Sequence, residues 1–144
     1  PSLAGHLENL ALCMLYGYPD FIQDAAVVAL ETQLPELEAM RQAYRQRRDL
    51  VCECLADCPG VRALKPDGGM FVMVDIRDTG LSAQAFADRL LDRHGVSVLA
   101  GEAFGPSAAG HISLGLVVGP EPLRDACQRI VRCANELMEG RGDA

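Results

Sequence analysis

The residues of this chain with the most reactive side chains are its cysteines, and their spacing decides what they could do. None of them forms a C-x-x-C pair, which is the spacing that zinc sites favour. Cys54 and Cys58 are four residues apart in a stretch that we expect to be helical, where small thiols are ordinary packing residues. We therefore predict reduced thiols in a cytosolic protein and no metal. The six cysteines are Cys13, Cys52, Cys54, Cys58, Cys127 and Cys133.

The histidines and the single lysine do not form a recognisable catalytic group. His6 falls in an expected helix, His94 precedes a helix stop and His111 opens an expected strand, so we interpret them as capping or surface residues. Lys65 stands beside Pro66 in an expected turn, with no apolar pocket or second cation apparent to lower its pKa. The sequence also contains no G-x-S-x-G, H-E-x-x-H, P-loop or dinucleotide fingerprint.

Length and composition exclude several classes of protein. A chain of 144 residues with 49% hydrophobic residues can form one domain with a core, or one domain and a piece of another. Its 13 Lys and Arg against 20 Asp and Glu give a net charge of −7, without a basic stripe, so nucleic acid is not an expected partner. The chain has no apolar run of about 20 residues and no cationic leader, which predicts a soluble, cytoplasmic protein and no membrane partner.

Three helices are expected in the first part of the chain. The first carries an apolar stripe at three- and four-residue steps and ends before Gly17. The second begins near Asp20, a plausible cap, and is interrupted by Pro35. A long charged helix follows over residues 36–56 and is interpreted as a connector. The stripe of the first helix is formed by Leu3, Leu7, Leu10 and Met14.

A hairpin and a capped helix are expected next. Residues 61–64 and 70–76 are apolar runs joined by a Pro- and Gly-containing turn, which is typical of two paired strands. Ser82 can cap the following helix and Gly95 can stop it. The apolar stripe of that helix is Phe86, Leu90 and Leu91.

The last part of the chain predicts two more strands and a final helix. The strands are expected over residues 96–99 and 111–118, with a glycine-punctuated loop over 101–110 between them. The order of elements is then ααα-ββ-α-β-β-α, which predicts the α/β class: an α+β small domain whose small mixed β-sheet is covered by helices. The stripe of the final helix is Leu123, Cys127, Ile130, Ala134 and Leu137.

Four segments, in this order, resemble the carboxy-terminal third of the class I/II (fold type I) pyridoxal-phosphate-dependent aminotransferases. They read LENLALCMLYGYPDFIQDAAVVAL, KPDGGMFVMVDI, FADRLLDRHGVSVLAGEAFGP and GHISLGLVVGPEPLRDAC. Any one of them is a weak signal, but four in order at family-like spacing are a strong one. Within the family, the segments LALCMLYG, GGMFVMVDI and GVSVLAGEAFGP are similar in sequence to those of the bacterial arginine–pyruvate aminotransferases.

The resemblance implies a domain division and a cofactor. Residues 1–34 would be the last helices of a truncated large domain that binds pyridoxal phosphate, and residues 35–144 the small carboxy-terminal domain with its connector helix. In the family a lysine forms a Schiff base with the cofactor. That lysine would lie upstream of Pro1, and Lys65 does not match it. No catalytic or cofactor-binding residue is therefore expected in this chain, which would be inactive alone.

Two positions of the sheet would line the substrate site. The family has an arginine at the position of Ser113, where its guanidinium grips the substrate α-carboxylate through two charge-assisted contacts. A serine offers one neutral hydrogen bond, so this departure affects substrate binding; the other readings are a variant chain, a shifted register or a plain strand serine. Phe71 matches an aromatic residue that lies against the substrate, and a core phenylalanine is the alternative.

Two further positions belong to the segment that family dimers offer to the neighbouring subunit's site. They are Cys13 and Tyr16. Family members specific for dicarboxylates have an arginine at the place of Cys13, so an aspartate-type side chain would lose its partner here. The resemblance thus implies a homodimer for the full-length enzyme.

The function implied is transfer of an amino group from an amino acid, arginine among them, to a 2-oxo acid such as pyruvate. Two alternatives remain from the residues themselves. One is a non-catalytic α/β ligand-binding or interaction module, since a fold alone does not fix a function. The other is a metal-binding regulator that uses the cysteines.

Overall fold

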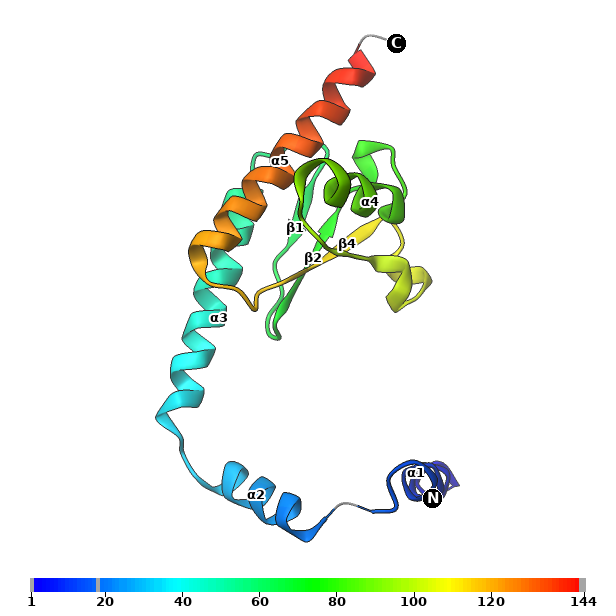
Figure 1. Cartoon of the computed structure of the whole chain (residues 1–144), viewed down its shortest axis with the longest axis vertical. Helices are drawn as coiled ribbons and strands as arrows, with labels where there is room; N and C mark the ends of the chain where they lie inside the picture. Colours follow the sequence, from blue (N-terminus) through cyan, green and yellow to red (C-terminus); the bar gives the residue numbers. More distant parts are fainter. Residues whose placement is uncertain (1, 18, 143–144) are drawn as a thin grey trace. The chain divides into compact units, whose positions relative to one another are not determined.

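A computed structural model describes residues 2–17 and 19–142 of the chain. They form two compact units, Pro1–Ala39 and Met40–Ala144, and each is described by itself. The expected order of helices and strands is confirmed, with three short 3₁₀ helices added between them. Figure 1 shows the helices and strands and labels most of them.

The first unit is helical. It contains α1 (Ser2–Leu15), α2 (Asp20–Glu31) and the start of α3 (Pro35–Cys54). The expectation that Asp20 caps α2 is wrong: Pro19 occupies the cap position without a side-chain hydrogen bond, and Asp20 is the first helical residue. Its carboxylate still lies where the positive end of the helix dipole favours an anion.

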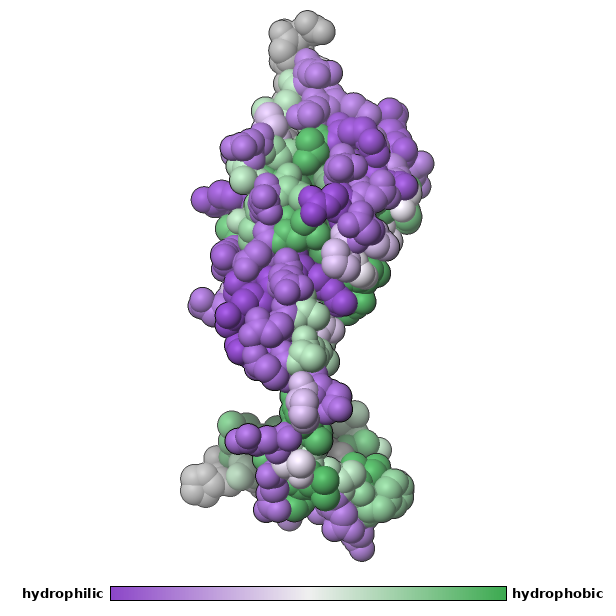
Figure 2. All heavy atoms as spheres, turned by 90° about the vertical axis from the view of Figure 1, so that its left-hand side faces the viewer, coloured by the Kyte–Doolittle hydropathy of each residue, from purple (hydrophilic) through white to green (hydrophobic). Residues whose placement is uncertain are grey.

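Apolar side chains of the first unit are exposed. No described residue of α1 or α2 is buried, and Figure 2 shows hydrophobic side chains on the surface of this unit. Monomeric soluble proteins rarely expose large contiguous apolar patches, so these helices have the surface of elements that pack against further protein. The most exposed are Leu3 (68%), Met14 (70%), Tyr16 (92%), Phe21 (72%) and Leu30 (88%).

The second unit is built on a four-stranded sheet with the order β1-β2-β4-β3. Its strands are β1 (Arg62–Leu64), β2 (Phe71–Asp75), β3 (Leu99–Ala100) and β4 (His111–Gly115). The expected hairpin is β1 and β2. All three strand pairs are antiparallel, so the sheet is not mixed as expected from the sequence.

Helices cover one face of this sheet, as the fold class predicted. The core joins strand residues to side chains of α3, α4 (Ala83–His94) and α5 (Pro120–Gly142). The Ser82 hydroxyl accepts a hydrogen bond from the Ala85 N–H at 3.2 Å, and Gly95 ends α4 at φ 66°, which confirms the expected start and stop. Leu91, however, is 51% exposed and does not belong to the buried stripe.

All four strands are shorter than expected, most of all β3 and β4. Val96 donates its N–H to the Leu90 carbonyl, so it completes the end of α4 and does not pair with a strand. Beyond β4, the Leu116 carbonyl accepts a hydrogen bond from Arg47 of α3 at 2.9 Å, and the chain then turns into α5. The connections contain the 3₁₀ helices η1 (Arg77–Thr79), η2 (Gly101–Phe104) and η3 (Pro106–Ala108).

Candidate functional site

Ser113 lies at the centre of the sheet face opposite to the one that the helices cover. The strand registers place Leu64, Met73, Ser113 and Leu99 in one row across all four strands. Successive strand residues point to opposite faces, so this row lies on the face away from the core residues Val72, Val74, Ile112 and Leu114. Ser113 is buried, with 5% of its surface exposed, so the row presents one hydroxyl group among apolar side chains.

Phe71 lies on the same face, one row along. It pairs with Gly115, which is two residues from Ser113 on β4. Phe71 is 51% exposed and Leu99 is 56% exposed, although both belong to strands. We call the set Leu64, Phe71, Met73, Leu99, Ser113 and Gly115 the open face. The structure therefore brings together the two sheet residues that the sequence singled out.

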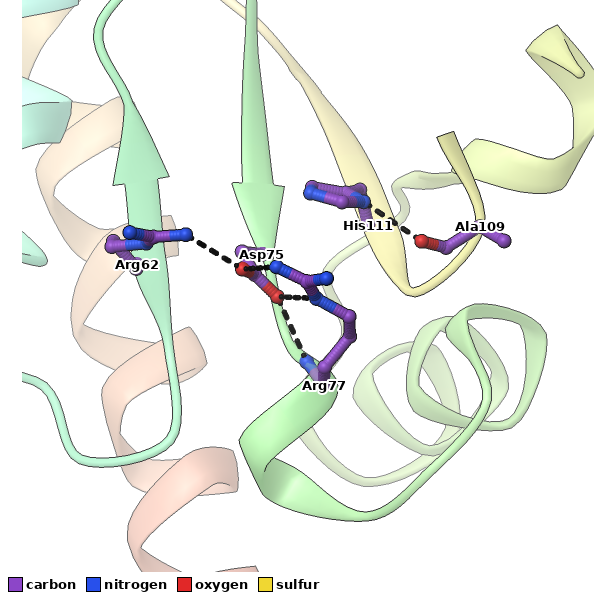
Figure 3. A network of polar contacts seen from close by, with 5 residues as sticks. All are labelled: Arg62, Asp75, Arg77, Ala109 and His111. Atoms are coloured by element: carbon purple, nitrogen blue, oxygen red, sulfur yellow. Dashed lines mark hydrogen bonds and ion pairs between the residues drawn. The ribbon is translucent and has the colours of Figure 1, made fainter. Parts of the chain in front are cut away.

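Beside the open face, the next row across the strands contains Arg62, Asp75 and His111. The negative charge of Asp75 is already paired with arginine side chains. The Asp75 carboxylate accepts hydrogen bonds from the Arg77 side chain at 2.9 and 2.6 Å and from the Arg77 N–H at 3.1 Å. Arg62 adds a contact at 3.0 Å. Figure 3 shows this cluster, with the His111 ring beside the Ala109 carbonyl.

The contacts in this cluster lower the pKa of Asp75. Hydrogen bonds from Arg77 and Arg62 hold the pKa of the Asp75 carboxyl well below its usual range, because they stabilise the ionised form. The Arg77 side chain also packs over Gly110, whose φ of 72° and missing side chain allow the approach. Sequence reasoning missed this cluster; the alternation of β1 and β2 could have shown Arg62 and Asp75 on one face.

The loop between β3 and β4 closes onto Gly101. Gly101 is buried, and a Cβ atom there would collide with the carbonyl oxygens of Ala108 and His111. The Glu102 carboxylate accepts the Gly110 N–H at 3.3 Å, which ties the two ends of the loop together. The close approach of backbone at Gly101 thus fixes where β4, and with it Ser113, begins.

The single lysine, Lys65, is part of a group of contacts that holds a turn together. The Lys65 ammonium lies 2.9 Å from the Asp49 carboxylate, and the Lys65 side chain is 57% exposed. Arg48 holds the same turn, since it donates to the Pro66 carbonyl at 3.2 Å and pairs with Asp49 at 2.8 Å. The ion pair with Asp49 thus holds the Lys65 side chain at the turn that follows β1.

Cys13 and Tyr16 belong to the first unit. Cys13 lies in the last turn of α1 and is exposed. Tyr16 follows α1, is 92% exposed and has a left-handed backbone with φ 52°, which is uncommon for a residue other than glycine. The two side chains are therefore available at the surface of this unit.

The remaining reactive groups do not assemble into a metal site in residues 2–17 and 19–142. No group of three or more His, Cys, Asp or Glu in this part of the chain could hold a metal ion. The cysteines are free thiols. His94 instead lies 3.5 Å from the Glu136 carboxylate, between α4 and α5. None of the helices in the described part is long and apolar enough to cross a membrane.

Comparison with known proteins decides the family. The family model described as aminotransferase class I and II matches residues 2–130. This chain belongs to that family. It is 81% identical over 137 residues to the arginine–pyruvate transaminase AruH of Pseudomonas aeruginosa, covering 95% of this chain and 35% of that protein. It is also 33% identical over 112 residues to an aspartate aminotransferase of Pyrococcus horikoshii, covering 76% of this chain and 29% of that one.

Solved structures agree with this assignment. An aromatic aminotransferase from Pyrococcus horikoshii superposes with a TM-score of 0.74 at 35% identity, covering 81% of this chain and 31% of that chain. A Thermus thermophilus aspartate aminotransferase solved with maleate has a TM-score of 0.60 at 38% identity, covering 67% and 24%. The chain thus spans about a third of the length of the curated relatives that it matches.

Proposed function

We propose that this chain is part of a pyridoxal-phosphate-dependent enzyme that transfers the amino group of an amino acid, arginine in the first place, to pyruvate or another 2-oxo acid. The observation that carries the proposal is the 81% identity to an arginine–pyruvate transaminase over 95% of the chain. Relatives at about a third identity are named for aspartate and aromatic amino acids, so the family alone does not fix the donor. Free thiols in all six cysteines support a reducing, cytoplasmic location.

In such an enzyme the open face would form one wall of the substrate site. Phe71 would lie against the substrate, because its ring is half exposed on a rigid central strand. Ser113 would give one neutral hydrogen bond where a guanidinium would give two charged ones. Arg62 lies in the neighbouring row and Arg77 begins η1 just after it, but both side chains already contact Asp75. The wall described here therefore binds a carboxylate more weakly than one with arginine at this position.

The residues of this chain do not fit a pyridoxal phosphate site of their own. The only lysine in the sequence is Lys65, which is exposed and paired with Asp49. We therefore assign the cofactor, and every step on it, to the part of the full-length enzyme outside this chain. Consistent with that, we propose that the isolated chain is inactive.

A chimera tests the activity. This chain would replace the matching portion of the P. aeruginosa transaminase, and kcat/KM would be measured with arginine and pyruvate, with alanine and aspartate as control donors. We expect turnover with arginine that depends on added pyridoxal phosphate. A folded, cofactor-bound chimera without turnover for any donor would contradict the proposal and favour the non-catalytic module.

The isolated chain tests the cofactor assignment. We expect that pyridoxal phosphate followed by borohydride leaves the intact mass unchanged, because the Lys65 side chain is 57% exposed and paired with Asp49. The matched variant is Asp49→Asn, which frees Lys65 and reports whether an available surface lysine is modified under the same conditions. A stoichiometric adduct on Lys65 of the unmodified chain would refute the assignment.

We further propose that residues 1–34 belong to the large domain and residues 35–144 to the small one. The support is the exposed apolar surface of α1 and α2, whose residues are all unburied where described. Limited proteolysis should then cut first just before Glu36, and a chain that starts at Pro35 should unfold at the same temperature as the whole chain. Uniform resistance in a dilute monomeric sample would contradict this division.

The full-length enzyme would be a homodimer to which Cys13 and Tyr16 contribute. Both are exposed at the end of α1, where Tyr16 holds an unusual left-handed backbone. In the chimera, Tyr16→Ala should raise KM while sedimentation still shows a dimer, and Leu3→Ala, in the helix that precedes Tyr16, is the control. An unchanged KM for Tyr16→Ala would remove this residue from the site.

A further inference from the structure

A surface pocket opens at the edge of the sheet where β3 ends. It has a volume of about 550 Å³ and is lined by β3, the start of α4 and η2. We call it the edge pocket. Among the described residues that line it, Glu102 alone is charged. Its apolar lining consists of Val98, Leu99, Ala100 and Ala103.

The edge pocket is continuous with the open face through Leu99. This residue pairs with Ser113 in the central row of the sheet, and it also lines the pocket. Neighbouring strands lie about 4.8 Å apart, so the pocket begins roughly one strand spacing from Ser113. An amino acid whose carboxylate lies at Ser113 can therefore extend a long side chain across Leu99 into the pocket.

The charge in the edge pocket is a carboxylate with acceptor capacity to spare. Glu102 is exposed, and its carboxylate accepts one hydrogen bond, from the Gly110 N–H at 3.3 Å. An ionised carboxylate offers about four acceptor sites. Backbone N–H groups, that of Glu102 itself before that of Gly110, hold the pKa of the Glu102 carboxyl below its usual range. The pocket thus presents a negative charge beside an apolar wall.

We propose that the edge pocket is the subsite for the side chain of the amino donor, where Glu102 binds a cation, such as a guanidinium, at the end of that side chain. The apolar lining suits a stem of methylene groups, and the carboxylate suits the charged end. This inference rests on the proposed function, because it assigns the donor specificity of the same site.

The sign of the charge sets an order among donors. A side chain that ends in a carboxylate would lie next to Glu102 with no cation in the described lining to offset the repulsion. A neutral side chain of the same length could still cover the apolar wall but would gain no ion pair. We therefore expect cationic donors to react best, long neutral donors less well and acidic donors least.

The test uses the chimera with Glu102→Gln. Glutamine keeps an oxygen that can accept the Gly110 N–H but carries no charge. The donors are arginine and citrulline, which has the same length and a neutral urea group in place of the guanidinium. We expect kcat/KM for arginine to fall roughly 5- to 10-fold, mainly through KM, and kcat/KM for citrulline to change by less than about twofold.

A second variant tests the same charge without altering Glu102. Ala103 is exposed and lines the edge pocket, so Ala103→Lys places an ammonium group beside the carboxylate and leaves the bond to Gly110 in place. This variant should also lose efficiency with arginine and not with citrulline. Glu121→Gln is the matched control, because it raises the net charge by one like the other two changes, at an exposed residue that does not line the pocket.

The outcomes separate this inference from the proposed function. Equal losses with arginine and citrulline would mean that Glu102 only ties the loop, and unchanged efficiency with arginine in both pocket variants would mean that it does not bind the donor. Either result overturns the inference and leaves the transaminase activity standing. A folded, cofactor-bound chimera that uses no donor would contradict the proposed function and this inference with it. Should Glu102→Gln fail to fold, Ala103→Lys decides the question.

Discussion

The two faces of the sheet both carry apolar side chains but differ in what covers them. On the core face, Val72, Val74 and Ile112 have no exposed surface, because α3, α4 and α5 cover them. On the open face, Phe71 of β2 and Leu99 of β3 are more than half exposed. For these apolar side chains, cover by the helices and not hydrophobicity therefore decides which of them are buried. The described residues thus leave apolar side chains of the open face uncovered.

Two leucine variants, one on each face, test this difference between the faces. Leu114 on the core face is 5% exposed and Leu99 on the open face is 56% exposed. We expect Leu114→Ala to lower the free energy of unfolding by about 2–5 kcal/mol, because it leaves a cavity, and Leu99→Ala to lower it by less than about 1 kcal/mol. Urea unfolding of the two variants measures both. Equal losses would mean that the open face is packed within this chain.

Two glycines give a smaller contrast of the same kind. A Cβ at Gly101 would collide with backbone carbonyl oxygens that cannot move freely, whereas at Gly115, on the open face, its nearest contacts would be ordinary ones of 3.8 and 3.9 Å. Gly101→Ala should cost about 1–3 kcal/mol of unfolding free energy, as overpacked sites do, and Gly115→Ala much less. Thermal unfolding checks this, and a neutral Gly101→Ala would contradict the close approach.

The charged row should give the smallest effect. The folded-state pKa of Asp75 is lowered, so its stabilisation is complete above the ordinary value near 3.8 and declines as pH falls below it. Because Arg62 and Arg77 are 70% and 60% exposed, solvent screening limits the contribution to about 1 kcal/mol. Asp75→Asn should flatten the loss of stability between pH 4 and pH 2, while Asp88→Asn, an exposed control, should not. If stability falls equally with pH in the Asp75→Asn and Asp88→Asn variants, the ionised Asp75 carboxylate does not stabilise the fold.

Much of the fold could be predicted from local patterns. Ser82 and Gly95 bound α4 as expected, because a cap and a stop act within one turn of the chain. The hairpin of β1 and β2 also follows from a local signal, the Pro- and Gly-containing turn between apolar runs. The segments that identified the family are spread over most of the chain, and the family match over residues 2–130 confirms them.

The rest depends on contacts between residues far apart in sequence. Leu91 fits a helical stripe but faces outward, since the sheet covers only the side of α4 that carries Phe86 and Leu90. The antiparallel pairing of β3 with β4 and the carbonyl contacts of Gly101 arise when the loop folds back. The strand pattern could identify Ser113 as a strand residue, but only the register shows it in the same row as Leu99.

Of the sites named from sequence, Ser113 is the one on which the proposed substrate wall depends. It is buried in the middle of the open face, and its apolar row contains no cation in the strands described here. An arginine at this position would supply two charge-assisted contacts to a substrate carboxylate, worth on the order of 2–3 kcal/mol.

The most direct measurement is kcat/KM for arginine and pyruvate in the chimera, with Ser113 and with Ser113→Arg. We expect the arginine variant to be roughly 30- to 150-fold more efficient, since about 1.4 kcal/mol corresponds to a tenfold change in rate. Ser113→Lys is the matched control, because it adds a charge without the two-pronged geometry and should recover only part of the gain. If serine performs as well as arginine there, this strand does not bind the substrate carboxylate and the proposed wall is wrong.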